Sequence, residues 1–266
     1  MRVLAGVPLL ALLTFPLGGR PQTQDSPQAQ GAAAEAAPAA VSPEIKLPDL
    51  TDEQRGDIYM ARKRYRDAID AYNESLKKSP NFLVYNKLGI AQHSLQMFSA
   101  AKRSYERSLK LNPKYAEARN NIGALYHAQK NYRGAVREYQ RALKINPNSA
   151  TIYANMGAAL FARKKYKEAE EAMQKALAID PNVYESRSQF GTILQERSVE
   201  ERARYHYFMA KAYARAGQTE RALQSIRRSL EEGFRERKRY LEEPEFAGLR
   251  ELPEFKKLMA AEFRAL

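Results

Sequence analysis

Between Leu50 and Pro181, one pattern of glycine and proline returns about every 34 residues. The glycines are separated by 33, 34 and 34 positions, and they are Gly56, Gly89, Gly123 and Gly157. The prolines show the same separations, and they are Pro80, Pro113, Pro147 and Pro181. Because two residue types keep one period, residues 50–181 are predicted to be four copies of one supersecondary unit. Such copies bury a core only by stacking on their neighbours.

The third copy, residues 116–149, shows what each unit is. Apolar or small residues recur three or four positions apart on both sides of a break near Lys130 and Asn131, which predicts two amphipathic helices. Gly123 and Ala135 allow these helices to approach closely. Pro147 ends the second helix, because proline lacks an N–H group and clashes with a preceding carbonyl. Each copy is therefore predicted to be a helical hairpin.

The other copies keep the same positions, with Gly56, Tyr59, Tyr65, Ala68, Tyr72 and Pro80, then Leu88, Gly89, Phe98, Ala101, Tyr105 and Pro113, then Met156, Gly157, Leu160, Tyr166, Ala169, Met173 and Pro181. This spacing resembles that of the tetratricopeptide repeat family. The resemblance implies an all-α fold, a right-handed superhelical solenoid of antiparallel helix hairpins. It also implies a concave groove that holds a peptide or a partner helix, and it does not imply an enzyme.

Two segments precede the repeats. Residues 1–19 begin with a basic residue and continue as an apolar run, which predicts a secretory signal peptide. A cleaved signal is the first interpretation and an uncleaved anchor is the second, although the run is short for a membrane span. Residues 20–49 are rich in proline, alanine and glutamine and have few large apolar side chains, which is typical of a disordered linker.

The register changes after the fourth copy. Ala210 and Ala222 are 12 positions apart, as Gly123 and Ala135 are, so a fifth hairpin is predicted at 203–233. Residues 182–202 are an insertion, in which 184–197 form either a lone helix or an irregular segment. A capping-box pattern begins at Ser198. Residues 234–266 are expected to cap the solenoid with two short helices that start at prolines and bury four apolar side chains, Phe246, Leu249, Phe255 and Leu258.

The sequence offers little for catalysis or for metal and cofactor binding. It has no cysteine and three histidines, and it lacks a serine nucleophile elbow, a glycine-rich phosphate loop and a zinc-binding helix motif. His93 and His127 are equivalent positions one repeat apart, which is too far for a shared metal ion, and such a site would also need a third ligand. Glu170 and Glu171 lie among lysines, so a solvated helix face is expected. No cofactor, no metal and no enzymatic activity are predicted.

The resemblance places the first helix of each hairpin on the groove. The predicted groove residues are Asn86, Lys87, His93, Asn120, Asn121, His127 and Asn155. A side-chain amide offers a donor and an acceptor, so a row of amides can bind the backbone of an extended peptide. The alternative is that the amides only bridge neighbouring helices. Capture of a carboxyl terminus is disfavoured, because Glu53 and Asp57 stand in the first copy where basic or amide groups are expected.

The basic residues are also patterned, on a chain with a formal net charge of +13. Several fall at the turns inside the hairpins and define a basic edge: Arg62, Lys63, Arg64, Lys130, Arg133, Arg163, Lys164, Lys165 and Lys167. This edge could bind anionic lipid, an acidic protein or a polyanion, or it could be a solubilising face. Nucleic acid is disfavoured, because the aromatic residues fall at core positions.

Together these features predict an exported adaptor of the bacterial cell envelope, periplasmic or tethered to a membrane if the signal is uncleaved. Its predicted partner is a protein or peptide bound in the concave groove. The alternative is a peripheral binder of an anionic membrane or polyanion through the basic edge.

Overall fold

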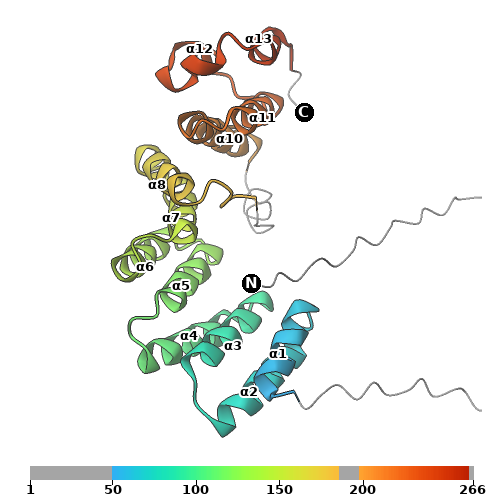
Figure 1. Ribbon diagram of the computed structural model, residues 1–266, viewed down its shortest axis with the longest axis vertical. Helices are drawn as coiled ribbons and strands as arrows, with labels where there is room; N and C mark the ends of the chain where they lie inside the picture. The colour runs from blue at the N-terminus through green and yellow to red at the C-terminus, as the bar shows by residue number, and fades with distance from the viewer. Residues whose placement is uncertain (1–49, 186–197, 264–266) are drawn as a thin grey trace, which may run out of the picture. The chain divides into compact units, whose positions relative to one another are not determined.

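The computed structural model describes residues 50–185 and 198–263, and every regular element within these ranges is a helix (Figure 1). These residues belong to one compact unit that spans residues 47–266. The predicted signal peptide at 1–19, the predicted linker at 20–49 and most of the ambiguous segment at 184–197 lie outside the described residues.

Eight helices form four consecutive hairpins: α1 (Asp52–Ala61) with α2 (Tyr65–Lys78), α3 (Phe82–Ser94) with α4 (Phe98–Leu111), α5 (Ala116–Ala128) with α6 (Tyr132–Ile145), and α7 (Ala150–Ala162) with α8 (Tyr166–Ile179). The two helices of each hairpin pack together, and each second helix packs on the first helix of the next hairpin. The first helices α3, α5 and α7 also contact one another in sequence. The prediction of an all-α solenoid of helix hairpins is confirmed.

The turn inside each hairpin uses a left-handed backbone conformation at one fixed position. The φ angles are 57° at Lys63, 58° at Gln96, 59° at Lys130, 60° at Lys164 and 71° at Gly217. In this region the Cβ atom of an L-residue crowds the following carbonyl, which costs about 1 kcal/mol or more. Only the last of the five turns places the favoured glycine there, so the first four hairpins carry this cost.

We therefore expect Gln96→Gly to stabilise the protein by about 1 kcal/mol. Gln96 is exposed, so glycine at this position would remove little buried side-chain surface. The measurement is urea unfolding followed by circular dichroism. The matched control is Gln129→Gly, since Gln129 is also exposed at the end of a first helix but has a φ of −80°, where glycine should destabilise. Equal effects of the two substitutions would contradict the prediction.

The fifth hairpin begins four residues earlier than the predicted boundary at 203. It consists of α10 (Val199–Arg215) and α11 (Thr219–Glu231), and α10 packs on α8 of the fourth hairpin. The earlier start follows from the cap at Ser198, whose side-chain oxygen accepts a hydrogen bond from the Glu201 N–H at 3.2 Å. The last part of the predicted insertion at 182–202 is therefore helical.

The C-terminal cap contains α12 (Lys238–Glu242), the 3-10 helix η1 (Pro244–Leu249) and α13 (Pro253–Ala260). η1 packs on α10 and α13 packs on α11. All four apolar side chains predicted to cover the last hairpin are buried: Phe246, Leu249, Phe255 and Leu258. The ring of Tyr207 in α10 also stacks on Phe234, with 4.6 Å between the ring centroids. Two helices that start at prolines thus close the stack, although the first is a 3-10 helix.

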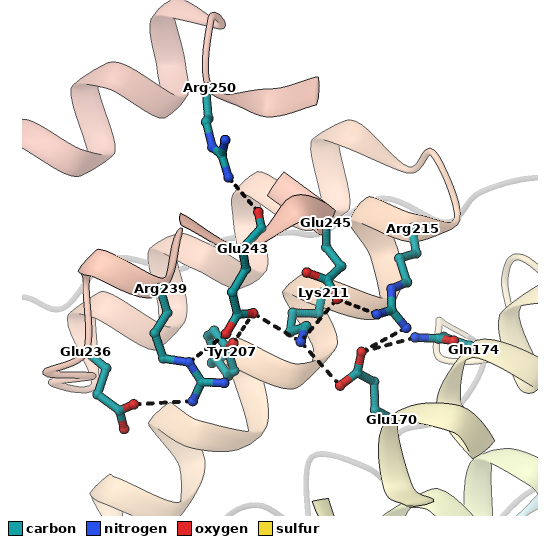
Figure 2. A network of polar contacts seen from close by, with 10 residues as sticks. All are labelled: Glu170, Gln174, Tyr207, Lys211, Arg215, Glu236, Arg239, Glu243, Glu245 and Arg250. Atoms are coloured by element: carbon teal, nitrogen blue, oxygen red, sulfur yellow. Dashed lines mark hydrogen bonds and ion pairs between the residues drawn. The ribbon is translucent and has the colours of Figure 1, made fainter. Parts of the chain in front are cut away.

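A buried network of charged side chains joins the cap to the fifth and fourth hairpins (Figure 2). At its centre Lys211, which is 8% exposed, lies 3.0 Å from Glu243 and 3.3 Å from Glu245 of the cap and 3.4 Å from Glu170 of α8. Arg215 also pairs with Glu170 at 3.0 Å. The expectation that Glu170 lies on a solvated face is wrong, because α10 covers it and supplies two cations.

Candidate functional site

Four asparagines on successive first helices are joined by hydrogen bonds, and we call them the amide row: Asn86, Asn120, Asn121 and Asn155. The Asn155 Nδ2 group donates to the Asn120 oxygen at 2.8 Å, which links α7 to α5. Asn120 donates to Asn121 at 3.3 Å, and Asn121 donates to Asn86 at 2.9 Å, which links α5 to α3. The amides therefore do bridge neighbouring helices, which is the alternative that the sequence left open.

Bridging does not use all the hydrogen-bonding capacity of the row. Asn86 and Asn120 are buried, while Asn121 and Asn155 are half-buried. An amide has two N–H donors and an oxygen with two lone pairs. The bonds to Asn86 and Asn120 use one donor and one lone pair of Asn121. Asn121 therefore keeps a donor and an acceptor with which to bind a further polar group.

Lys87 extends this polar surface to α1. Its ammonium group lies 2.7 Å from a carboxylate oxygen of Glu53 and 2.7 Å from one of Asp57, and Asp57 also accepts a hydrogen bond from the Tyr72 hydroxyl at 2.8 Å. Burial alone would lower the pKa of Lys87, but the bonds to Asp57 and Glu53 outweigh it and raise the pKa. A partner's terminal carboxylate would have to displace these two carboxylates from Lys87, and the expectation that such capture is disfavoured stays a prediction.

The two predicted groove histidines pack inside their hairpins. The His93 ring meets Phe98 edge-on with 5.7 Å between centroids, and the His127 ring meets Tyr132 at 5.1 Å. Burial lowers the pKa of His93. In the fourth hairpin Phe161 fills the same place against an aromatic residue. This position is a packing position of the repeat, and a role of either histidine in partner binding stays a prediction.

The residues of the basic edge lie where the sequence predicted, in the turns inside the first, third and fourth hairpins or at the second residue of the helix that follows. All of them are exposed. Two are partly neutralised, because Arg64 pairs with Asp67 at 2.9 Å and Lys165 with Glu168 at 3.8 Å. Binding of anionic lipid or a polyanion by this edge stays a prediction.

Within residues 50–185 and 198–263, no cluster of three or more histidine, aspartate or glutamate residues is arranged to hold a metal ion. Among the helices that the structure describes, none has the length and apolar character needed to cross a membrane.

Comparison with protein families identifies the repeats. Profiles described as tetratricopeptide repeat match residues 53–82, 83–115, 104–137 and 150–183, and one described as TPR repeat matches 125–162. The chain is a tetratricopeptide repeat protein. Proteins of this family are typically non-enzymatic scaffolds for protein interactions, and this chain has that repeat architecture. No curated protein sequence matches the chain.

Several solved structures are similar to this tetratricopeptide repeat protein. A crystal structure of MamA is 23% identical over 66% of this chain and 93% of its own, with a TM-score of 0.47. MamA from Desulfovibrio magneticus RS-1 is 20% identical over 66% and 89%, with a TM-score of 0.46. YrrB, described as a TPR protein with an unusual peptide-binding site, is 17% identical over 67% and 82%, with a TM-score of 0.43. The identification rests on the repeat profiles and not on these structures.

The sequence predicted the members of the amide row but not how they pair. Asn86 and Asn120 are equivalent positions 34 residues apart, yet they are not bonded directly. The bonds run diagonally, from Asn121 to Asn86 and from Asn155 to Asn120, which are both 35 residues apart. A search for amides one residue beyond the repeat period would have found these pairs.

Proposed function

We propose that the first helices of this tetratricopeptide repeat protein hold an extended peptide or a helix of a partner protein, in a non-enzymatic adaptor. The observation that carries the proposal is the amide row, in which Asn121 is half-buried and keeps one donor and one acceptor. A peptide backbone offers the complementary acceptor and donor at every residue, whatever its sequence.

We place this adaptor in the bacterial cell envelope. The proposal of export rests on the basic and apolar start of the sequence at 1–19 and on the linker composition at 20–49. Fractionation of the source cells, with an antibody against the repeats, would test it. Recovery in the cytoplasmic fraction alone would contradict an envelope location.

The test of partner binding starts from peptides selected with the full chain out of a random library displayed on phage. Selected peptides should bind Asn121→Ala/Asn155→Ala at least about tenfold more weakly, because two hydrogen-bonding amides are removed. Isothermal titration calorimetry at moderate salt measures this loss. Circular dichroism should show that the variant keeps its helices, since each lost bond costs only about 1 kcal/mol of stability.

The matched control is Gln140→Ala/Lys144→Ala, which removes an amide and a cation from the exposed face of α6, a second helix. This control should bind the selected peptides as the parent does. Equal affinity for the amide-row variant and the parent would contradict the proposal. Binding that disappears at moderate salt and depends on Lys164 and Lys165 would instead favour the basic edge.

A further inference from the structure

A cleft of about 630 Å³ is lined by residues of the second helices α2 and α4. Residues of α3 also line it, namely Tyr85, Leu88 and Gln92. Along the α4 side it is lined by Arg103, Ser104 and Arg107 among others. None of the amide-row residues lines this cleft. It is therefore a site separate from the one in the proposed function.

In the third repeat, the region equivalent to this cleft contains a buried carboxylate of the chain itself. In α6, Glu138 is only 6% exposed, and its carboxylate lies 2.6 Å from Arg141, 3.8 Å from Arg119 and 4.0 Å from Arg137. A buried carboxylate is stable there because several guanidinium groups surround it. The third repeat thus contains a carboxylate site that its own chain fills.

The second repeat keeps two of the arginines and lacks the carboxylate. Arg103 and Arg107 stand 34 residues before Arg137 and Arg141, but the position of Glu138 holds Ser104. Ser104 is 6% exposed, and its hydroxyl bonds the Gln92 side chain at 2.7 Å. Within the described ranges, 50–185 and 198–263, neither Arg103 nor Arg107 forms an ion pair. The shorter side chain leaves the cations facing the cleft.

The other charged residues that line the cleft reduce its positive charge but do not cancel it. On the α2 side it is lined by Asp70 and Glu74, and Glu74 is neutralised by Lys77 at 2.6 Å. Arg107 also lies over the Tyr85 ring, 5.8 Å from its centroid. Two arginines therefore face one unpaired aspartate, and the remaining charge of the cleft is positive. Leu76 and Leu88 also line the cleft, and although both are largely buried they add a small apolar surface to it.

We propose that this cleft binds an acidic segment of a partner protein, with a glutamate side chain of the partner taking the place that Glu138 has in the third repeat. Arg103 and Arg107 would hold its carboxylate, and Leu76 and Leu88 would contact the partner's apolar atoms. A cleft of this volume is much larger than one carboxylate, and residues of three helices line it. These features fit a peptide better than a small carboxylate ion.

The experiment uses the full chain and a short synthetic peptide of alternating glutamate and alanine with blocked ends, in calorimetry at low salt. The peptide should bind the parent protein, and the same peptide with glutamine in place of glutamate should not. Arg103→Gln/Arg107→Gln should lower the affinity at least about tenfold, the effect of removing charge-assisted bonds. Arg137→Gln is the matched control, since Arg137 occupies the same place beside Glu138, and it should change the affinity little.

A second variant fills the site from within. Ser104→Glu places a carboxylate beside Arg103 and Arg107, as Glu138 lies beside Arg137 and Arg141 in the third repeat, and it should abolish peptide binding. If this variant fails to fold, the peptide affinity of the arginine variants still tests the proposal. Equal binding by the parent and the arginine variants would overturn the proposal, as would no binding to the parent. Acetate that binds with the same arginine dependence and blocks the peptide at equal carboxylate concentration would show a small-carboxylate site and overturn the assignment to a partner protein.

Discussion

Replacing Lys211 with methionine is expected to destabilise the protein by about 4 kcal/mol at neutral pH. Methionine has nearly the same length, so the packing over Tyr207 is largely kept and the charge alone is lost. Glu243, Glu245 and Glu170 would then share Arg215 and Arg239 as their nearest cations. A carboxylate buried with too few cations is far more costly than an exposed one. Urea unfolding followed by circular dichroism measures the loss.

The matched control for this prediction is Lys256→Met. Lys256 also pairs with a glutamate, Glu251 at 2.8 Å, but both side chains are largely exposed. Exposed ion pairs of this kind contribute little to stability, so the unfolding midpoint of the control should stay close to that of the parent. If Lys211→Met had as small an effect as Lys256→Met, the network would not be what holds the cap on the fifth hairpin.

The loss at Lys211 should depend on pH. Burial alone would raise the pKa of Glu243 and of Glu245, but hydrogen bonds and cations, Lys211 among them, outweigh it and hold both pKa values below the ordinary 4.5. In the parent, these carboxylates add stability above pH 4.5, which is lost as the pH falls through their lowered pKa values. Without Lys211 they should take up protons more readily. The difference between variant and parent should therefore be smaller near pH 4 than at pH 7, and a constant difference would contradict this account.

Most of the fold can be predicted from the sequence, because the same pattern of packing residues occurs in each repeat. Glycine, alanine and proline mark each hairpin, and their period predicts four hairpins without any knowledge of tertiary contacts. The cap was also predictable, since Phe246 and Phe255 each follow a proline at the start of a short apolar pattern. The start of α10 does not follow from the repeat period, because residues 182–202 break that period and only the Ser198 cap marks the helix.

The buried charge network could not be predicted from the sequence. The residues next to Glu170 in the sequence are like those next to an exposed glutamate, so the local sequence does not predict that it is buried. Its ion-pair partners, Lys211 and Arg215, come from α10, which follows the insertion. Lys211 lies in the second half of a helix whose exposed and buried faces are set by where the cap packs. No local sequence pattern predicts which charged residues the cap will cover, because their burial depends on contacts between segments far apart in the chain.

The candidate site was predictable in its residue types but not in its bonding. The repeat register placed Asn121 and Asn155 on equivalent first-helix positions, which drew attention to amides there. Whether such amides bind a partner or one another depends on how far each hairpin is displaced relative to the next one. The sequence alone does not predict this displacement. The same holds for Lys87, whose pairing with Glu53 and Asp57 of the preceding repeat follows from stacking.

The close approach of the helices in each hairpin leads to the second large effect, a loss of about 3 kcal/mol for Gly123→Ala. A Cβ atom on Gly123 would lie 2.5 Å from Cε1 and 2.7 Å from Cδ1 of the Tyr139 ring. Tyr139 is 2% exposed, so its rigid ring is enclosed by other residues of the core. Either the ring or the helix must shift, and a well-packed core resists both. Urea unfolding followed by circular dichroism measures this loss.

The fourth hairpin supplies the control, because it pairs its glycine with a flexible side chain. A Cβ atom on Gly157 would meet Cγ of Met173 at 3.1 Å, and methionine can adjust its torsions. Alanine is also favoured over glycine inside a helix by about 1 kcal/mol, so Gly157→Ala should be nearly neutral. Adding Tyr139→Met to Gly123→Ala recreates the fourth-hairpin pair, and the two changes together should cost less than the sum of each alone. Additive costs would mean that the tyrosine ring does not cause the loss, and that the glycine is needed for another reason.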